Sequence, residues 1–345
     1  MPRFVLSFGL VVLWIAVGAP MALADPPGPT DFRSEVVEIE PALAGFEIEI
    51  VGGDSFVLLN VDEGVTAEVV GYQGESYLRF LGDGTVEENA VSPSKYLNED
   101  RYAAGVLPEV VDVAGAPVWR VVGSDGSYAW HDHRTHWMNP LDPPGLGPGD
   151  QIAEGVVPLV VNGTEIDVTV VSIWQPAPSA VPVLLGFVVG AVLGLIAFLR
   201  RDLLARITLL LAAGASFVAL LAYRSVPPET QPSWSLLLFP LASLLIAAIA
   251  LSPGLLRTRG DAIRRQQTVL LLLASLELVV WAFLHWDWLW RAILPTNLPF
   301  WLDRFVTATV FVAGLGATAA ALAAAGSPSP QSPLWGEGTA GGSRG

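Results

Sequence analysis

The 345 residues of the chain include no cysteine. Disulfide bonds, thiolate nucleophiles and thiolate metal ligands are therefore excluded, and any metal site must use nitrogen, oxygen or methionine sulfur. Complete catalytic motifs are missing as well, because the sequence has no G-x-S-x-G, no H-E-x-x-H, no P-loop and no G-x-G-x-x-G that opens a helix. We therefore do not expect an enzyme.

Positive charge is scarce in the first half of the chain. From Asp25 to Pro178 there are 26 acidic and only 6 basic residues, whereas the rest of the chain has 7 acidic and 12 basic residues. The overall hydrophobic content of 52% therefore averages two unlike parts, an acidic aqueous domain and a membrane domain. The acidic charge argues against nucleic acid or an anionic lipid surface as a partner and favours cations.

Residues 1–24 have the pattern of a secretory signal peptide. Arg3 precedes an apolar run, and Ala22-Leu23-Ala24 supplies a cleavage site before Asp25. An uncleaved membrane anchor is the alternative. In both cases the residues from Asp25 onward are expected on the extracytoplasmic side.

Residues 25–178 have the pattern of a β domain. The segments Phe46–Ile50 and Ile166–Val170 alternate strictly between apolar and polar residues, and Gly52-Gly53-Asp54 supplies a turn. Short strands at regular spacing, with no helical stretch, predict an all-β sandwich of the immunoglobulin-like or cupredoxin-like kind. The segment 175–182 (QPAPSAVP) is expected to be a stiff spacer.

Residues 179–325 contain five apolar segments that predict an all-α, five-helix transmembrane domain in a lipid bilayer. The expected helices cover about 181–199, 207–223, 234–251, 268–286 and 305–324. The arginines in the connections 200–206 and 252–267 predict that these connections are cytoplasmic. The N-terminal domain would then be extracytoplasmic, and the Gly/Ser/Pro-rich tail 326–345 would be cytoplasmic and disordered.

Two groups of residues stand out within the membrane domain. Glu277 and His285 lie on one helical stripe, which suggests a cation or proton relay; the alternative is a protonated Glu277 that hydrogen-bonds a neighbouring helix. Gly186, Gly190 and Gly194 form a doubled G-x-x-x-G. This motif permits close helix packing, either within the chain or in a homo-oligomer.

Three of the four histidines fall within the nine residues Trp130–Met138 (WHDHRTHWM). We expect a strand followed by a loop here, so His131 and His133 would share one face about 6–7 Å apart, while His136 would face the other side. On a helix, His133 and His136 would pair instead at positions i and i+3. A three-histidine metal site therefore needs a bend near Thr135, or a third ligand from elsewhere. A structural cluster and a pH sensor are the alternatives to a metal site.

The type of ligand narrows the choice of ion. A nitrogen-rich site without thiolates favours copper by affinity order, with zinc as the alternative. Met138 could add a soft ligand for Cu(I), and Asp132 could hydrogen-bond an imidazole and fix its tautomer. The alternative for Asp132 is a surface ion pair with Arg134. The sequence thus predicts a metal-binding protein for homeostasis or delivery, with other envelope or metal-handling proteins as possible partners. The alternative is an envelope interaction or assembly protein whose β domain binds another protein.

The segment Trp130–Met138, the upstream segment Gly71–Phe80 (GYQGESYLRF) and the segment Leu294–Arg304 (LPTNLPFWLDR) carry a family resemblance. Together they resemble a family of uncharacterised bacterial membrane proteins with an exported β domain and a C-terminal multi-helix membrane domain. The resemblance covers most of residues 40–305. It implies this architecture and no assigned activity.

Overall fold

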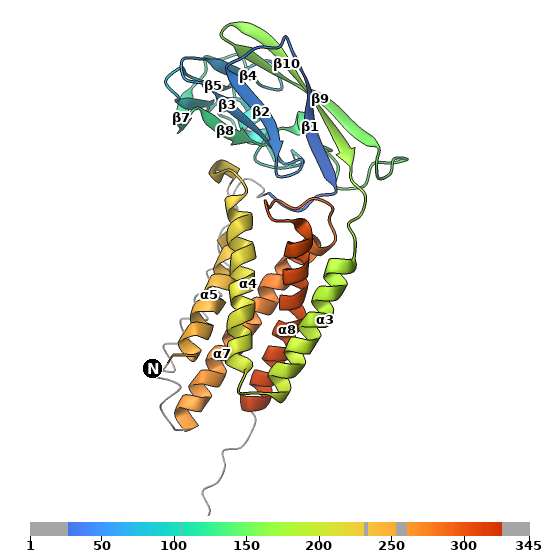
Figure 1. Cartoon of the computed structure of the whole chain (residues 1–345). Coiled ribbons are helices and arrows are strands. Elements are labelled where there is room, and N and C mark those ends of the chain that lie inside the picture. Colours follow the sequence, from blue (N-terminus) through green and yellow to red (C-terminus); the bar gives the residue numbers. More distant parts are fainter. Residues whose placement is uncertain (1–26, 104, 231–233, 253–260, 326–345) are drawn as a thin grey trace, which may run out of the picture.

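The computed structural model describes residues 27–325 except 104, 231–233 and 253–260. An antiparallel β domain forms the N-terminal half, and a bundle of helices forms the C-terminal half beneath it (Figure 1). The expected signal peptide and the expected disordered tail lie outside the described residues, so both stay predictions.

The β domain contains two antiparallel sheets. The larger has the order β1-β10-β9-β4-β5-β6-β7 and the smaller has the order β2-β3-β8. The strands are β1 (Phe32–Glu40), β2 (Phe46–Val51), β3 (Phe56–Val61), β4 (Ala67–Val70), β5 (Ser76–Phe80), β6 (Val86–Asn89), β7 (Trp119–Gly123), β8 (Ser127–Trp130), β9 (Gln151–Val161) and β10 (Thr164–Trp174).

The two sheets share one hydrophobic core. The alternating residues Ile166, Val168 and Val170 of β10 are buried together with Val57 and Leu59 of β3 in the smaller sheet. Burial of each such side chain contributes about 1.5–3 kcal/mol. The predicted β domain is confirmed, while an immunoglobulin-like or cupredoxin-like type stays a prediction.

The expectation that this domain has no helical stretch is wrong. A short helix, α2 (Pro93–Leu97), follows β6. Ser92 caps it by accepting a hydrogen bond from the Ser94 backbone N–H, and Pro93 fits its first position. Five residues are too few to show a helical hydrophobic period in the sequence.

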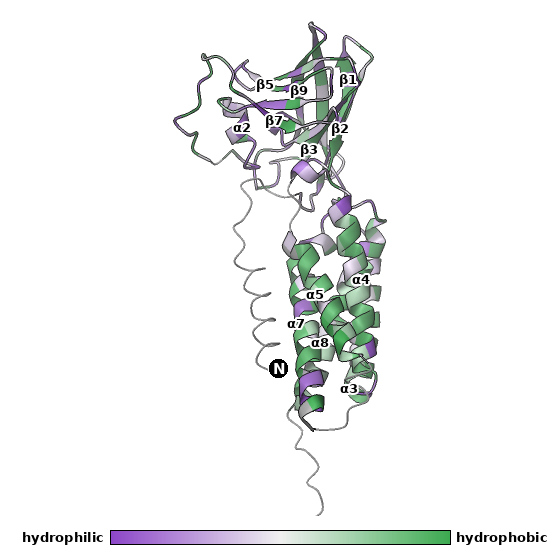
Figure 2. Ribbon diagram, turned by 90° about the vertical axis from the view of Figure 1, so that its left-hand side faces the viewer, coloured by the Kyte–Doolittle hydropathy of each residue, from purple (hydrophilic) through white to green (hydrophobic). Residues whose placement is uncertain are grey.

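The C-terminal half contains the long helices α3 (Val181–Leu199), α4 (Leu204–Arg224), α5 (Trp234–Ala250), α7 (Asp261–Leu284) and α8 (Phe300–Ala325). Among the described residues, four helices are long and apolar enough to cross a membrane, and α5 is a shorter apolar helix. Figure 2 shows the apolar residues along the whole bundle. The 3-10 helices η2 (Pro228–Thr230) and η3 (Trp286–Leu289) follow α4 and α7.

Three of these helices begin earlier than expected. α4 starts at Leu204 rather than near 207, α7 starts at Asp261 rather than near 268, and α8 starts at Phe300 rather than near 305. Hydropathy detects only the apolar part of a helix, whereas the backbone hydrogen bonds continue into polar turns that contain Arg264 and Asp303. The expected start of α3 at Val181 is confirmed.

The glycine stripe of α3 packs against α8 within the same chain. A Cβ added to Gly186 would lie 2.6 Å from the carbonyl oxygen of Phe305, and one added to Gly190 would lie 2.7 Å from that of Thr309. Gly194 meets the Cα of Gly316. Small residues thus allow the two backbones to approach closely, and a homo-oligomer through the same stripe stays a prediction.

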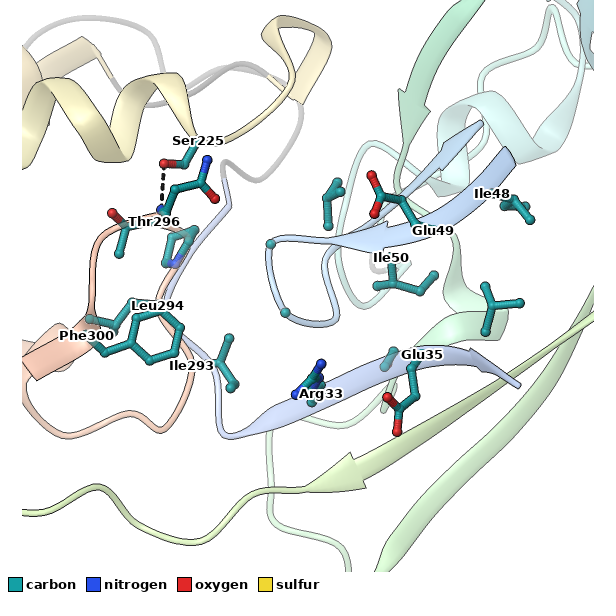
Figure 3. A pocket seen from close by; sticks show the side chains of 17 residues that line it. Arg33, Glu35, Ile48, Glu49, Ile50, Ser225, Ile293, Leu294, Thr296 and Phe300 are labelled. Atoms are coloured by element: carbon teal, nitrogen blue, oxygen red, sulfur yellow. Dashed lines mark hydrogen bonds between the residues drawn. The ribbon is translucent and has the colours of Figure 1, made fainter. Parts of the chain in front are cut away.

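The β domain is attached to the membrane half at a second place besides the spacer before α3. Thr30 forms an antiparallel bridge with Ile293 in the connection between η3 and α8. The Asp31 carboxylate bonds Arg291 at 2.6 Å and accepts a hydrogen bond from the backbone N–H of Ala292 at 2.8 Å. Beside this joint, a cavity of about 600 Å³ separates β1 and β2 from the connection that leads to Phe300 (Figure 3).

Candidate metal centre

The histidine segment changes direction immediately after β8. The strand ends at Trp130, and a single 3-10 turn, η1 (His133–Thr135), follows. Asp132 caps this turn: its side chain accepts the Arg134 N–H, and its carbonyl accepts the Thr135 hydroxyl at 2.8 Å. His131 and His133 are therefore not on a strand, contrary to expectation, but the bend that a three-histidine site needs is present.

η1 lies against the larger sheet. Ser34 of β1 donates its hydroxyl to the carbonyl oxygen of Thr135. A Cβ added to Gly155 of β9 would lie only 2.0 Å from the carbonyl oxygen of Arg134. Glycine at this position is what allows the turn to approach the sheet.

The three imidazole rings gather on one side of the turn. The ring centroid of His131 lies 4.5 Å from that of His136 and 5.2 Å from that of His133. One potential ligand nitrogen from each ring lies within 4.8 Å of the others. Tetrahedral metal–nitrogen bonds of about 2.1 Å place ligand nitrogens about 3.4 Å apart, so these nitrogens would have to move closer together by up to about 1.4 Å on binding.

Each imidazole donates one ring N–H to a backbone carbonyl. Nδ1 of His131 donates to Ser55 O at 2.6 Å, Nδ1 of His136 to Trp137 O at 3.0 Å, and Nε2 of His133 to Asp100 O at 2.8 Å. In the neutral rings, the lone pairs are then on Nε2 of His131 and His136 and on Nδ1 of His133.

Two of these lone-pair nitrogens are orphaned. Nε2 of His131 and Nε2 of His136 are buried without a hydrogen-bond partner. Buried polar atoms normally have partners, so two orphans in one cluster call for an explanation. A metal ion would satisfy both, and the opposite ring nitrogens are already held by acceptors, as is usual for histidine ligands.

Burial keeps the imidazoles neutral. It lowers the pKa of His131 to about 4, helped by the repulsion that a protonated His131 would meet from a protonated His133 and from Arg101. It lowers the pKa of His136 to about 2, helped by His131 and Arg101, and it lowers the pKa of His133 as well. At neutral pH all three rings are therefore in the unprotonated form that binds metals.

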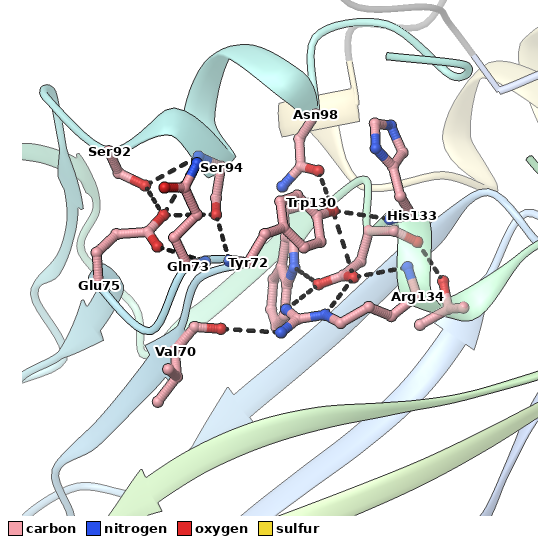
Figure 4. Close-up of polar contacts among 12 residues, drawn as sticks. Val70, Tyr72, Gln73, Glu75, Ser92, Ser94, Asn98, Trp130, His133 and Arg134 are labelled. Carbon is pink, nitrogen blue, oxygen red and sulfur yellow. Dashed lines mark hydrogen bonds and ion pairs between the residues drawn. The ribbon is translucent and has the colours of Figure 1, made fainter. Parts of the chain in front are cut away.

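Asp132 does not hydrogen-bond an imidazole, which corrects the sequence expectation. Its fully buried carboxylate accepts Nε of Arg134 at 2.8 Å, Nη2 of Arg134 at 2.7 Å and Nε1 of Trp130 at 3.0 Å (Figure 4). Burial would raise the pKa of Asp132, but the Arg134 guanidinium holds it below its usual range. Arg134 belongs to the 3-10 turn that Asp132 caps, so the bonds between these two side chains stabilise the turn.

Tyr72, from a distant part of the chain, contacts both the ring and the backbone of His133. It was not among the site residues predicted from the sequence. Its ring stacks on that of His133 at a centroid distance of 5.7 Å and an interplanar angle of 9°. Its hydroxyl accepts the backbone N–H of His133 at 2.8 Å and donates to Asn98 (Figure 4). The Arg134 guanidinium lies 4.9 Å from the Tyr72 ring centroid. The only sequence signal was that Tyr72 belongs to the segment Gly71–Phe80, which carries the family resemblance.

A buried ion pair connects the two chain segments whose backbone carbonyls accept hydrogen bonds from His131 and His133. Arg101 follows Asp100, which accepts from His133, and Asp54 precedes Ser55, which accepts from His131. The Arg101 guanidinium bonds the fully buried Asp54 carboxylate at 2.5 Å. The ion pair therefore fixes the segments that orient two of the three imidazoles.

The remaining predicted site residues lie apart from this cluster or have no contact that assigns them to it. Glu277 accepts a hydrogen bond from Ser243 of the neighbouring helix α5 at 3.1 Å, as in the alternative to a relay, and the protonation of Glu277 stays a prediction. His285 is buried between the rings of Trp281 and Trp288, at centroid distances of 4.4 and 4.8 Å. A relay through Glu277 and His285 stays a prediction, as does a ligand role for the half-buried Met138.

Comparison of the chain with protein-family models, with curated proteins and with solved structures found no match. The family resemblance therefore stays a prediction, and the geometry of the histidine cluster is what points to a function.

Proposed function

We propose that this membrane protein binds one transition-metal ion at His131, His133 and His136 on the extracytoplasmic side, for metal homeostasis or delivery. The observation that carries the proposal is the group of three imidazoles. Each has one nitrogen held by a backbone carbonyl, one potential ligand nitrogen of each ring lies within 4.8 Å of the others, and Nε2 of His131 and of His136 are buried without a partner. Copper is the preferred ion because the site offers only imidazole nitrogen, and zinc is the alternative.

The extracytoplasmic location is supported by the distribution of charge. The β domain precedes the first residue of α3, so the arginines at 200, 201 and 206 lie at the opposite end of the bundle. Short loops rich in arginine are retained in the cytoplasm, which leaves the β domain outside. The 26 acidic residues of that domain would concentrate cations around the site.

The test is titration of the purified full-length protein, in detergent, with Cu(II), Cu(I) and Zn(II). We expect one ion per chain in the wild type and none in the variant with His131→Ala, His133→Ala and His136→Ala. Circular dichroism of the triple variant checks that the β domain still folds. The half-buried His133→Ala alone, which disturbs the core less, should already weaken binding more than about tenfold.

Met138→Leu is the companion variant, because it removes the sulfur while keeping a similar volume. Selective loss of Cu(I) affinity would establish Met138 as a ligand. The proposal is abandoned if the wild type binds none of the three ions, or if the triple variant binds them with unchanged affinity.

A further inference from the structure

Two edge strands of the β domain face each other near the membrane half. β1 is an edge strand of the larger sheet, and β2 is an edge strand of the smaller sheet. The backbone N–H of Ser34 in β1 donates to the carbonyl oxygen of Gly53, in the turn after β2, at 3.0 Å. This bond shows that the outer edge of β1 faces β2 and its turn. An edge strand offers its unpaired backbone N–H and C=O groups to any strand that can reach them.

The cavity of about 600 Å³ lies between these two strands and the membrane half (Figure 3). A volume in this range is typical of a site for a ligand the size of a short peptide. The lining consists of residues 33–36 of β1, residues 48–51 of β2, Gly52 and Gly53 of the turn, and, from the membrane half, Ser225, residues 293–297 and Phe300.

β2 has the more regular of the two edges. It pairs with β3 in unbroken register from Phe46 to Val51. The register of β1 shifts between Val36 and Glu38, immediately after the residues that line the cavity. A bulge of this kind bends an edge strand and interrupts further pairing. A strand added in the cavity would therefore pair with β2.

The charge of the cavity defines the chemistry of its occupant. Glu35 and Glu49 line it together with one basic residue, Arg33, and the wall from the membrane half contributes no charged residue. In the described part of the chain, neither glutamate belongs to an ion pair. The same two strands also carry glutamates 38, 40 and 47. A second copy of these strands would be repelled, whereas a basic segment would be attracted.

We propose that an extended basic segment of another protein binds in this cavity as a strand added to the free edge of β2. Its lysine or arginine side chains would lie beside Glu35 and Glu49. Because side chains alternate along a strand, the intervening residues would be apolar and would contact Ile50 and Ile293. This interaction surface is independent of the metal site proposed above.

The experiment uses the full-length, metal-free protein in detergent. The probes are short synthetic peptides in which lysine alternates with valine, leucine or phenylalanine. The chain has no cysteine, so a fluorophore on Asn297→Cys, at an exposed residue that lines the cavity, reports binding there. We expect a saturable change in fluorescence, and none from the same fluorophore on Glu165→Cys, which lies outside the cavity.

A peptide in which lysine alternates with proline tests for strand addition. It has the same charge, but every second residue lacks the backbone N–H that pairing requires. By isothermal titration, we expect it to bind at least about tenfold more weakly than the best lysine-containing probe.

The key variant combines Glu35→Gln with Glu49→Gln. Both side chains are exposed, so we expect an affinity about threefold to tenfold lower and an unchanged fold. The matched control combines Glu154→Gln with Glu165→Gln, which removes the same charge from exposed positions outside the cavity. It should bind the probes like the wild type.

Four results would overturn the proposal. The first is that none of the probes binds, and the second is that the lysine–proline peptide binds equally well. The third is an equal loss of affinity in the two double variants, which would assign binding to the overall acidity of the domain. The fourth is binding without a response at position 297. The metal titrations described above are unaffected by any of these results.

Discussion

The orientation of each imidazole is set by main-chain carbonyls. Ser55, Asp100 and Trp137 accept the ring N–H groups of His131, His133 and His136. A carbonyl can only accept, so it determines which nitrogen keeps the lone pair. The cluster is therefore preorganised before any ion arrives, and the ring rotations that binding would otherwise have to restrict are already limited.

The buried imidazoles should make the metal-free protein sensitive to mild acid. Histidine in an unfolded chain has a pKa near 6.5, whereas burial lowers the pKa of His131 to about 4 and that of His136 to about 2 in the folded protein. Below about pH 6.5 the unfolded state binds protons that the folded state cannot. The stabilisation is thus complete above this pH and is lost as the pH falls towards 4, by about 1–3 kcal/mol per pH unit.

Chemical denaturation of the metal-free protein between pH 7.5 and 5, followed by tryptophan fluorescence, measures this slope. The triple His→Ala variant serves as the reference and should have a flatter profile. Identical profiles for the two proteins would contradict the burial of neutral imidazoles.

The sequence identified the three histidines as a group because side-chain chemistry is visible in it. It also indicated that they need a bend near Thr135 to meet. The acceptors at Ser55 and Asp100 could not be predicted, because every residue carries a backbone carbonyl and both residues are distant in sequence. The sequence left two partners open for Asp132, an imidazole or Arg134, because both types of donor are adjacent to it. The structure has the pair with Arg134, which is buried rather than on the surface.

Among the strands and turns, the contact between η1 and β9 decides the position of the site. The turn contributes His133 directly and places His136 immediately after it. Its approach to the sheet depends on the missing side chain of Gly155. An isolated glycine in a strand pattern suggests a close backbone approach, but the sequence does not show what approaches.

Gly155→Ala should displace η1, because the new Cβ would lie 2.0 Å from the Arg134 carbonyl oxygen. We expect a loss of about 1–3 kcal/mol in the free energy of unfolding, as for other overpacked sites, together with weaker metal binding. Denaturation and metal titration measure the two effects. Gly147→Ala is the control, since a Cβ there meets nothing within 4 Å. Unchanged metal affinity in Gly155→Ala would show that the sheet does not position the turn.

Taken whole, the chain holds its β domain against the membrane half at two places, the spacer before α3 and the joint around Asp31. The order of the two parts was predictable from composition and hydropathy. Their relative placement was not, because Thr30 and Ile293 pair through backbone groups across most of the chain.

Asp31→Ala should loosen this joint, because it removes the bonds to Arg291 and to the Ala292 N–H. The Asp31–Arg291 pair is half exposed, so its contribution to stability should not exceed about 1 kcal/mol. The effect should appear as motion between the two parts. Since the chain has no cysteine, spin labels at Glu165→Cys and Asp202→Cys report one distance, and its distribution should broaden in Asp31→Ala. An equally narrow distribution would show that the spacer alone fixes the placement.

The use of main-chain acceptors also bears on how the sequence can change over evolution. Replacing the side chain at 55, 100 or 137 leaves the backbone carbonyl in place. Substitutions at these positions therefore do not change which ring nitrogen of each histidine carries the proton. Gly155 has no such freedom, because a single added carbon atom meets the turn. In an alignment of homologous sequences, we expect the three histidines and this glycine to be conserved together, while the side chains at 55, 100 and 137 vary.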